Sequence, residues 1–237
     1  MRENEPSKEK TTVKEMFNHI AKTYDKTNRV LSFGMDLRWR KQLAKHFPNK
    51  KEIHLLDLAT GTADQLIALF DSKAPIRSAI GIDLAAEMIQ IGEQKIRNKP
   101  YKDQIELQIG DAMHLPFEEA SFEVCTFSFG IRNIPDPLHG LNQIHRILKP
   151  QGRCLILEFS LPKFPFKWPY LLYLRYILPW LGGKLSRAPK AYRYLNRTIE
   201  TFPSGSAFVG LMKRAGFSHV KAHPMALGAV TLYVGEK

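Results

Sequence analysis

The stretch Ile53-His-Leu-Leu-Asp-Leu-Ala-Thr-Gly-Thr-Ala-Asp64 carries the clearest signal of fold in this chain. Its first half is an apolar run with the length of a buried strand, and its second half is a turn of small residues that leads into helical spacing. A buried strand, a small-residue turn and a helix in succession begin a βαβ unit. The stretch therefore indicates an α/β fold with a parallel sheet.

The same alternation continues toward the C-terminus. We expect strands at residues 53–59, 78–83, 105–110, 122–129, 153–159, 220–223 and 230–234. We expect helices at residues 64–70, 86–97, 137–148 and 204–215. Strands that alternate with helices form a mostly parallel sheet, whereas the last two strands are close enough in sequence to pair antiparallel. The prediction is a Rossmann-like α/β fold: a seven-stranded, mostly parallel sheet with helices on both faces and an antiparallel last strand.

Two segments lie outside this alternation. Residues 1–12 are charged and polar, and we expect a disordered tail there. Residues 13–237 then form a single domain. Its first part, 13–50, is predicted to be a helical cap over the substrate, with a short helix at the start and a polar, aromatic loop from residue 24 to 40. The insert 161–201 is aromatic and basic, and its prolines are expected to divide it into short helices.

Composition limits the class of protein. The chain has 237 residues with 44% apolar content, and its 35 basic and 23 acidic residues give a net charge of +12. Such a charge attracts nucleic acid or an anionic membrane, or it simply keeps the surface solvated. The longest apolar run, 168–181, is shorter than the ~20 residues of a bilayer span and contains Arg175. We therefore expect a cytoplasmic protein that makes transient contact with the inner face of the membrane.

Open α/β sheets bind ligands at the carboxyl ends of their strands, so the residues that follow each strand are the first candidates. Asp57 and the turn at Gly61 follow the first strand, where small residues let the backbone approach a ligand and a helix N-terminus favours a negative group. Asp83 follows the second strand, where a carboxylate can accept both hydroxyls of a ribose. Asp111 and Ala112 follow the third and can pair with an adenine edge. Ser128 follows the fourth.

Together these positions suit a ligand that joins a nucleoside to an amino acid, namely S-adenosylmethionine. NAD stays open as a second interpretation because dehydrogenases also place an acid after the second strand, but the fingerprint G-x-G-x-x-G is absent. Taken alone, each acidic residue is more often a helix cap. The eight histidines show no paired ligand spacing, so no metal is expected.

Longer motifs resemble those of the UbiE/MenG/COQ5 quinone C-methyltransferases, over about residues 14–237. The most specific motif combines Tyr24-Asp25, Asn28, Leu31-Ser-Phe-Gly-Met35 and Arg38-Trp-Arg40. The others are Ser128-Phe-Gly-Ile-Arg-Asn133 and Arg146-Ile-Leu-Lys-Pro-Gln-Gly-Arg153, which runs into Leu157-Glu-Phe-Ser160. The resemblance implies a class I S-adenosylmethionine-dependent methyltransferase with cofactor contacts at Thr62, Asp83, Asp111, Ala112 and Ser128.

The resemblance also implies the acceptor and the catalytic residues. The acceptor would be a lipid-soluble prenylated quinol, with demethylmenaquinol favoured over 2-methoxy-6-polyprenyl-1,4-benzoquinol, and the protein would be a homodimer. The pair Arg132 and Asn133 would orient a water acting through the phenol, with Tyr24 and Asp64 as further candidates. The structural alternatives are an ion pair for Arg132, core packing for Tyr24 and a helix-dipole partner for Asp64.

The chain departs from the family pattern at Thr60, Ala63 and Gln151, each of which replaces a glycine; we expect a type I turn at Gln151. The insert is the candidate wall of a prenyl tunnel or a membrane-facing helix, with a plain lid as the alternative. Two rival functions stay open. An RNA or tRNA methyltransferase would explain the charge, but no Asn-Pro-Pro-Tyr or Pro-Cys motif occurs, so we expect no nucleic acid partner. The other rival is a non-catalytic, S-adenosylmethionine-binding scaffold of a quinone-synthesis complex.

Overall fold

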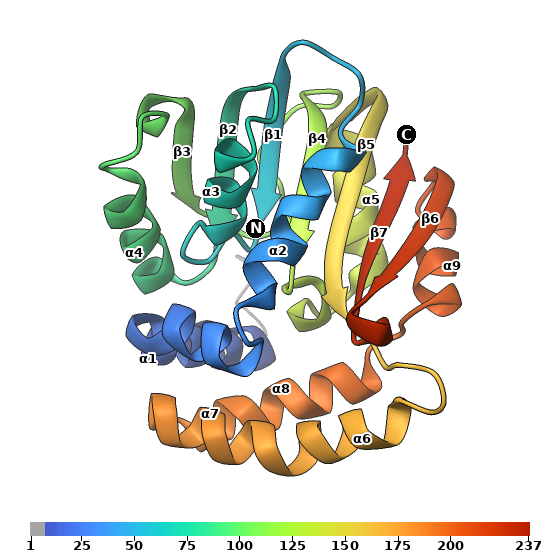
Figure 1. Ribbon diagram of the computed structural model, residues 1–237. Helices are drawn as coiled ribbons and strands as arrows, with labels where there is room; N and C mark the ends of the chain where they lie inside the picture. Colours follow the sequence, from blue (N-terminus) through green and yellow to red (C-terminus); the bar gives the residue numbers. More distant parts are fainter. Residues whose placement is uncertain (1–7) are drawn as a thin grey trace.

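The computed structural model describes residues 8–237, with side chains from Thr12 onward. Seven strands form one sheet in the order β3-β2-β1-β4-β5-β7-β6 (Figure 1). The strands are β1 Ile53–Leu58, β2 Ile76–Asp83, β3 Ile105–Ile109, β4 Phe122–Ser128, β5 Leu148–Phe159, β6 Ser218–Met225 and β7 Val230–Glu236. Strand β7 runs antiparallel to both of its neighbours, and the other neighbouring pairs are parallel. The predicted sheet is confirmed, including its antiparallel last strand.

Helices cover both faces of the sheet. The α-helices are α1 Lys8–Leu31, α2 Met35–Gln42, α3 Asp64–Asp71, α4 Ala86–Ile96, α5 Pro137–Ile147, α6 Lys167–Leu172, α7 Leu178–Ser186, α8 Pro189–Thr201 and α9 Ser206–Arg214. Shorter helical segments are η1 Leu43–His46, η2 Lys102–Gln104, η3 Ile131–Asn133, η4 Tyr173–Ile177 and η5 Ala226–Gly228. Successive strand residues point to opposite faces. Leu56 therefore packs in a cluster with α5 and α9, and Leu55 packs in a cluster with α3 on the other face.

Local sequence explains where several helices begin. Helix α5 begins with Pro137, which has no N–H to leave unpaired in a first turn, and the side chain of Asp136 accepts a hydrogen bond of 3.0 Å from the His139 N–H. Pro179 and Pro189 likewise stand in the first turns of α7 and α8. Pro189 therefore begins α8, whereas Pro179 does not divide the insert, because α6, η4 and α7 follow one another without a break.

Helix α1 is the largest departure from the sequence prediction. It begins at Lys8, where we expected a tail up to residue 12, and it continues to Leu31 through the predicted loop. The first residues are Lys-Glu-Lys-Thr-Thr, which form a helix without any apolar periodicity that could reveal it. Ile20, Tyr24 and Leu31 do recur at helical spacing, so the loop prediction was wrong. Residues 1–7 of the predicted tail lie outside the described residues.

The carboxyl ends of the parallel strands point toward α1 and toward the insert helices α6, α7 and α8, which lie below them in Figure 1. A third core joins these layers, with Ile20 of α1, Met88 of α4, Leu174 and Tyr192 among its buried members. The Tyr173 hydroxyl donates a hydrogen bond of 2.8 Å to the Leu31 carbonyl, which ties the insert to the end of α1. A ligand at the strand ends would thus lie between the sheet and helices from α1 and the insert.

Candidate functional site

Two cavities lie side by side at the carboxyl ends of the strands. The strand-end cleft has a volume of about 90 Å³ and is lined chiefly by residues that follow β1, β2, β3 and β4. The apolar cavity has a volume of about 280 Å³ and is lined by α1, α2, the segments after β4 and β5, and the insert helices. Both cavities share the wall residues Phe17, Tyr24, Phe129 and Asn133. Ligands in the two cavities would therefore meet at this wall.

Asp83 lies at the end of β2 in the strand-end cleft. One carboxylate oxygen accepts a hydrogen bond of 2.9 Å from the Gly61 N–H, and the other accepts one of 2.9 Å from the Ala85 N–H. Burial raises the pKa of Asp83, although these backbone N–H groups lower it. A carboxylate offers about four lone-pair sites, so both oxygens can still accept from hydroxyls of a ligand.

Four other predicted cofactor residues also line the strand-end cleft: Gly61, Asp111, Ala112 and Ser128. A Cβ added at Gly61 would meet no atom within 4 Å, so the backbone here borders open space that a ligand can approach. The Ser128 hydroxyl donates a hydrogen bond of 2.8 Å to the side chain of Gln65, which leaves its oxygen free to accept. The sheet brings together residues that lie far apart in sequence.

Asp57 and Thr62 do not line the cleft. The Asp57 carboxylate is buried under the turn, where it accepts hydrogen bonds of 2.7 Å and 2.6 Å from the hydroxyls of Thr60 and Thr126. Burial raises the pKa of Asp57 to about 6, and the hydrogen bonds from Thr126 and Thr60 lower it. The Thr62 hydroxyl donates to Asp25 of α1 at 2.6 Å. Both side chains therefore stabilise the turn through hydrogen bonds on the side away from the cleft.

The backbone conformation shows which of the three residues that replace glycines are strained. Thr60 is not among the residues with a positive φ, and its hydroxyl is the one that binds Asp57. Ala63 does adopt the left-handed conformation, with φ of 63°, directly before α3. Gln151 has φ of 62°, so the expected type I turn at that position was wrong. Only two of the three replacements therefore carry backbone strain.

Asp64 lies in an ion network behind the turn and lines neither cavity. Its carboxylate pairs with Lys95 of α4 and with Arg29 of α1, and Arg29 also pairs with Asp36 of α2. Burial by itself raises the pKa of Asp64, but the charges of Lys95, Arg40 and Arg29 hold this pKa below its ordinary value. The network joins α1, α2 and α4 to the cofactor turn.

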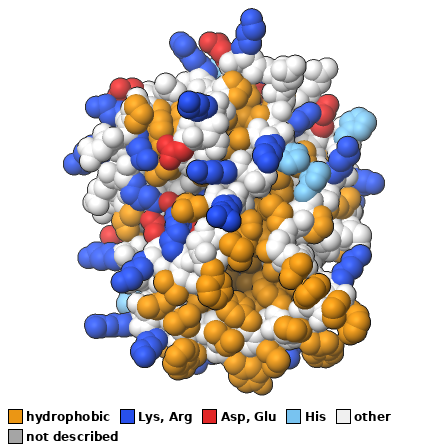
Figure 2. Space-filling view, in the orientation of Figure 1, with side chains coloured by type: hydrophobic (Ala, Val, Ile, Leu, Met, Phe, Trp, Pro, Cys, Tyr) orange, Lys and Arg blue, Asp and Glu red, His pale blue; other side chains and the backbone are white. Residues whose placement is uncertain are grey.

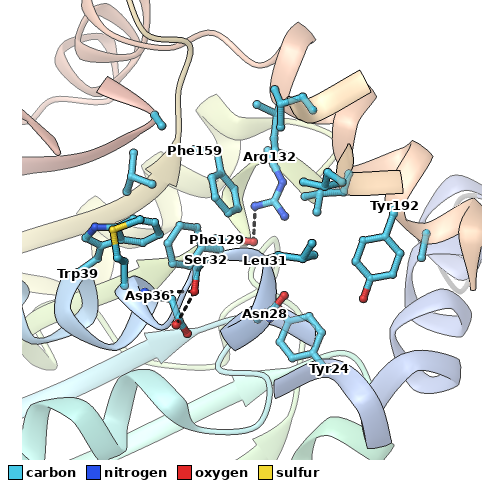
Figure 3. A pocket seen from close by; sticks show the side chains of 18 of the residues that line it. Tyr24, Asn28, Leu31, Ser32, Asp36, Trp39, Phe129, Arg132, Phe159 and Tyr192 are labelled. Atoms are coloured by element: carbon cyan, nitrogen blue, oxygen red, sulfur yellow. Dashed lines mark hydrogen bonds between the residues drawn. The ribbon is translucent and has the colours of Figure 1, made fainter. Parts of the chain in front are cut away.

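Arg132 and Asn133 lie in η3, at the wall of the apolar cavity. Arg132 forms an ion pair of 2.7 Å with Glu158, and both side chains are almost completely buried. It also donates a hydrogen bond of 2.5 Å to the Phe129 carbonyl (Figure 3). The Asn133 Oδ1 is buried and has no hydrogen-bond partner. Since such an atom is costly unless something binds it, it marks the place of a polar ligand atom.

Tyr24 projects into the same cavity, opposite Arg132 in Figure 3. Burial raises the pKa of Tyr24, against the charges of Arg40 and Arg132, so its hydroxyl is neutral and can donate a hydrogen bond. Sequence reasoning missed several wall residues, including Arg40, Trp39 and Phe159. The signal for Arg40 and Trp39 was present in the Arg38-Trp-Arg40 motif, to which no role had been assigned.

The strand order, the antiparallel last strand and the acidic strand ends define a class I S-adenosylmethionine-dependent methyltransferase. Residues 4–237 match the model of the ubiE/COQ5 methyltransferase family, and the chain belongs to that family. The residues of the strand-end cleft fit S-adenosylmethionine, since Asp83 retains free lone pairs and Gly61 borders open space. Within the described residues, no three His, Cys, Asp or Glu side chains group so as to hold a metal ion.

Two relatives are similar to this chain over nearly their whole length. The chain is 40% identical over 226 residues to the ubiquinone/menaquinone biosynthesis C-methyltransferase UbiE of Geotalea daltonii, covering 95% of this chain and 96% of that protein. It is 36% identical over 238 residues to the demethylmenaquinone methyltransferase of Staphylococcus carnosus, covering 100% and 97%.

Solved structures agree on the fold. An S-adenosylmethionine-dependent methyltransferase structure from Methanococcus maripaludis superposes with a TM-score of 0.68 at 17% identity, covering 100% of this chain and 97% of that chain. One from Thermotoga maritima gives 0.65 at 20% identity, covering 94% and 99%.

Proposed function

We propose that this protein methylates a ring carbon of a prenylated quinol in menaquinone or ubiquinone biosynthesis, with demethylmenaquinol as the favoured acceptor. The observation that carries this proposal is the apolar cavity, which shares a wall with the strand-end cleft and encloses a few polar groups among aromatic side chains. A flat diol ring with an isoprenoid tail has the same distribution of polar and apolar atoms. The names of the Geotalea and Staphylococcus relatives support the same acceptor class.

On the donor side, we propose that residues of the strand-end cleft bind and orient the methyl donor. S-adenosylmethionine supplies a methyl group on a sulfonium when bound. We propose that Asp83 accepts from ribose hydroxyls, that Asp111 and Ala112 contact the base, and that Ser128 lies near the reacting centre. We propose that Asp57 and Thr62 act indirectly, because their side chains hold the turn rather than line the cleft. Since methyl transfer is an in-line displacement, much of the rate comes from holding the two reactants in register.

The acceptor side holds a phenol among apolar side chains. We propose that the unpartnered Oδ1 of Asn133 accepts a hydrogen bond from a quinol hydroxyl, and that the neutral Tyr24 hydroxyl donates to a quinol oxygen. Arg132 keeps its guanidinium beside this site through its ion pair with Glu158. Asp64 lines neither cavity, so we propose that it positions the cofactor turn and does not contact the substrate.

We test this function with labelled S-adenosylmethionine and two reduced, short-chain acceptors, a demethylnaphthoquinol and a methoxybenzoquinol. We expect methyl transfer to the naphthoquinol, and we expect Asp83→Ala to abolish it. The ratio of the two rates identifies the pathway. If the protein binds S-adenosylmethionine but methylates neither quinol, the acceptor assignment is wrong and transfer RNA becomes the next substrate to assay. If it binds no S-adenosylmethionine, the scaffold alternative is favoured.

We propose further that the insert docks on an anionic membrane surface. Trp168, Leu172, Tyr176 and Trp180 follow one another at intervals of four residues and are between 59% and 69% exposed, so they form one apolar helix face. Figure 2 shows hydrophobic side chains gathered at this end of the molecule. Within 161–201 the sequence has basic residues at Lys163, Lys167, Arg175, Lys184, Arg187, Lys190, Arg193 and Arg197, and one acidic residue, Glu200.

An apolar helix face flanked by cations is the arrangement by which helices lie in the interface of anionic lipid. Phe33 is 82% exposed and also lines the apolar cavity, so the cavity opens to the surface at Phe33 and a quinol tail could enter there. In the part of the chain that the structure describes, no helix has the length and apolarity to cross a membrane.

The docking proposal is tested with vesicles of phosphatidylcholine alone and of phosphatidylcholine mixed with phosphatidylglycerol. We expect Trp168→Ser/Trp180→Ser to weaken binding to the anionic vesicles at least about tenfold, because two large aromatic side chains no longer enter the interface. The matched control is Ile109→Ser, which removes an equally exposed side chain at the end of β3. Equal binding by the double variant and the control would exclude the insert as the docking face. Homodimer formation stays a prediction, to be checked by analytical ultracentrifugation.

A further inference from the structure

Arg40 carries a buried charge that the site described so far does not use. Its side chain stands near the end of α2, is 7% exposed and lines the apolar cavity. The Nε atom is buried without a hydrogen-bond partner. Among the residues that the structure describes, no carboxylate forms an ion pair with this guanidinium. A buried cation is costly unless an anion or several acceptor atoms compensate it.

The other charges at this cavity are already compensated. Arg132 is neutralised by Glu158, and Asp36 is neutralised by Arg29. The charge of Arg40 lowers the pKa of both Asp57 and Asp64, but neither carboxylate forms an ion pair with it. Asp57 accepts from two hydroxyls, and Asp64 shares Arg29 with Asp36 and Lys95 with Asp25. Arg40 is therefore the charged group at the cavity that makes no ion pair within the described protein, and its Nε has no hydrogen-bond partner. An anionic atom of a ligand would supply that direct contact.

Two aromatic rings beside the guanidinium groups indicate where the ligand would lie. The Arg40 guanidinium lies 5.2 Å from the centre of the Phe129 ring, and the Arg132 guanidinium lies 5.3 Å from the centre of the Phe159 ring. The two rings are themselves 4.6 Å apart. The cavity thus holds two adjacent aromatic rings with one guanidinium on each. A planar acceptor that packs against these rings would have a cation near each side, and the two oxygens of a quinol lie at opposite ends of its ring.

From this geometry we infer that Arg40 binds one ring oxygen of the acceptor as a phenolate, while Asn133 and Arg132 hold the oxygen at the other end. The inference rests on the proposed quinol function. On ionisation the hydroxyl proton passes to water, and the negative charge left on the oxygen spreads onto the ring carbon beside it. That carbon would then bond to the methyl group as the methyl–sulfur bond of S-adenosylmethionine breaks and S-adenosylhomocysteine leaves. The proton displaced from the ring carbon would pass to water. A preorganised cation in a water-poor cavity stabilises such a charge more than water does.

The first test is a binding measurement that needs no turnover. The probes are 2-hydroxy-1,4-naphthoquinone, which is an anion at neutral pH, and its neutral methyl ether, 2-methoxy-1,4-naphthoquinone. Titration calorimetry should show that the native protein binds the anion about tenfold or more tightly than the ether. Arg40→Gln should lose this preference while its affinity for the ether stays within about twofold. Arg38→Gln, in the same helix but exposed, is the matched control and should keep the preference.

The second test measures catalysis. Arg40→Gln should lower kcat/KM for the naphthoquinol about 100-fold, as the loss of one preorganised donor does elsewhere. Arg40→Lys, which keeps the charge, should recover part of the rate. The affinity for S-adenosylmethionine should stay within about threefold in both variants, because Arg40 does not line the strand-end cleft; this also shows that they fold. If Arg40→Gln does not fold by this criterion, the preference for the anion and the value of kcat/KM are compared between Arg40→Lys and the native protein.

The outcomes separate this inference from the proposed function. A native protein that prefers the anion but methylates no quinol would retain the Arg40 anion site and exclude the quinol assignment. A native protein that methylates quinols but shows no preference for the anion would overturn the inference about Arg40 alone. Arg40→Gln with unchanged preference would overturn it as well.

Discussion

The strand-end cleft and the apolar cavity share a wall but are built in opposite ways. The cleft is made of backbone groups and short side chains such as Gly61, Asp83 and Ser128, each at or just after the end of a strand. The apolar cavity is made of long side chains from α1, α2 and α8, and its charged groups are compensated in pairs except at Arg40. We therefore propose that the donor is recognised by polar atoms at the strand ends, and the acceptor by shape and a few buried charges.

The largest expected effect tests whether the acceptor side depends on its buried ion pair. Arg132→Met leaves the buried Glu158 without its counter-ion, and we expect the free energy of unfolding to fall by about 3–5 kcal/mol. Arg132→Met/Glu158→Leu should recover at least half of this loss, while methyl transfer stays abolished in both variants. Urea unfolding at neutral pH measures the stability. A double variant as unstable as the single one would mean that the buried carboxylate is not the cause.

On the donor side, the buried Asp57 should make stability depend on pH. Its pKa is raised to about 6 in the folded protein, so the folded state binds its proton more tightly than the unfolded state does. Stability should then fall as the pH rises through about 4 to 6, by up to about 3 kcal/mol from this residue. Asp57→Asn should remove that fall, and the difference between the two unfolding curves, recorded from pH 4 to 7, isolates it. Parallel curves would refute the assignment.

Asp83→Ala should weaken the binding of the methyl donor and leave the binding of the acceptor unchanged. The variant loses a carboxylate that holds the Gly61 N–H and is proposed to accept from ribose hydroxyls, so the Kd for S-adenosylmethionine should rise about 100-fold. The affinity for 2-methoxy-1,4-naphthoquinone should not change, because Asp83 does not line the apolar cavity. Calorimetry measures both, with the exposed Asp103→Ala as the control. If both affinities fall together, the two cavities are not independent.

The smallest effect concerns the two strained residues that replace glycines. Gln151 is exposed, so Gln151→Gly should relieve its left-handed backbone and raise the free energy of unfolding by about 1 kcal/mol. Ala63 is fully buried, and Ala63→Gly should change stability by less than about 0.5 kcal/mol because the lost methyl packing offsets the relief. Thermal unfolding measures both, and Gln151→Ala, which keeps the Cβ, should show no gain.

The difference between the two cavities also explains what could be predicted from sequence. Gly61, Asp83, Asp111, Ala112 and Ser128 were found because a parallel sheet brings all strand ends to one edge, so position along the chain fixes position in space. The burial of the Asp57 carboxylate under the turn could not be predicted this way, since it depends on hydrogen bonds from the hydroxyls of Thr60 and Thr126.

The walls of the apolar cavity follow no such rule. Tyr24, Arg132 and Asn133 came from the family resemblance, and all three line the cavity. Arg40 was quoted in a motif but given no role, because its burial results from the packing of α2 against α3 and from the Phe129 ring beside it. The length of α1 was missed for a related reason: its start has no apolar residues, and its middle mixes cavity, core and ion-network positions.

Helix α1 has a consequence for engineering. None of the residues 161–201 lines the strand-end cleft, so an exchange of that insert between relatives would alter the acceptor cavity and leave donor contacts intact. Helix α1 does not allow such an exchange, since Phe17 and Tyr24 line both cavities and Arg29 is paired with Asp64. Chimeras that keep α1 with its own sheet should remain active, and the junction before residue 161 is the natural place to join them.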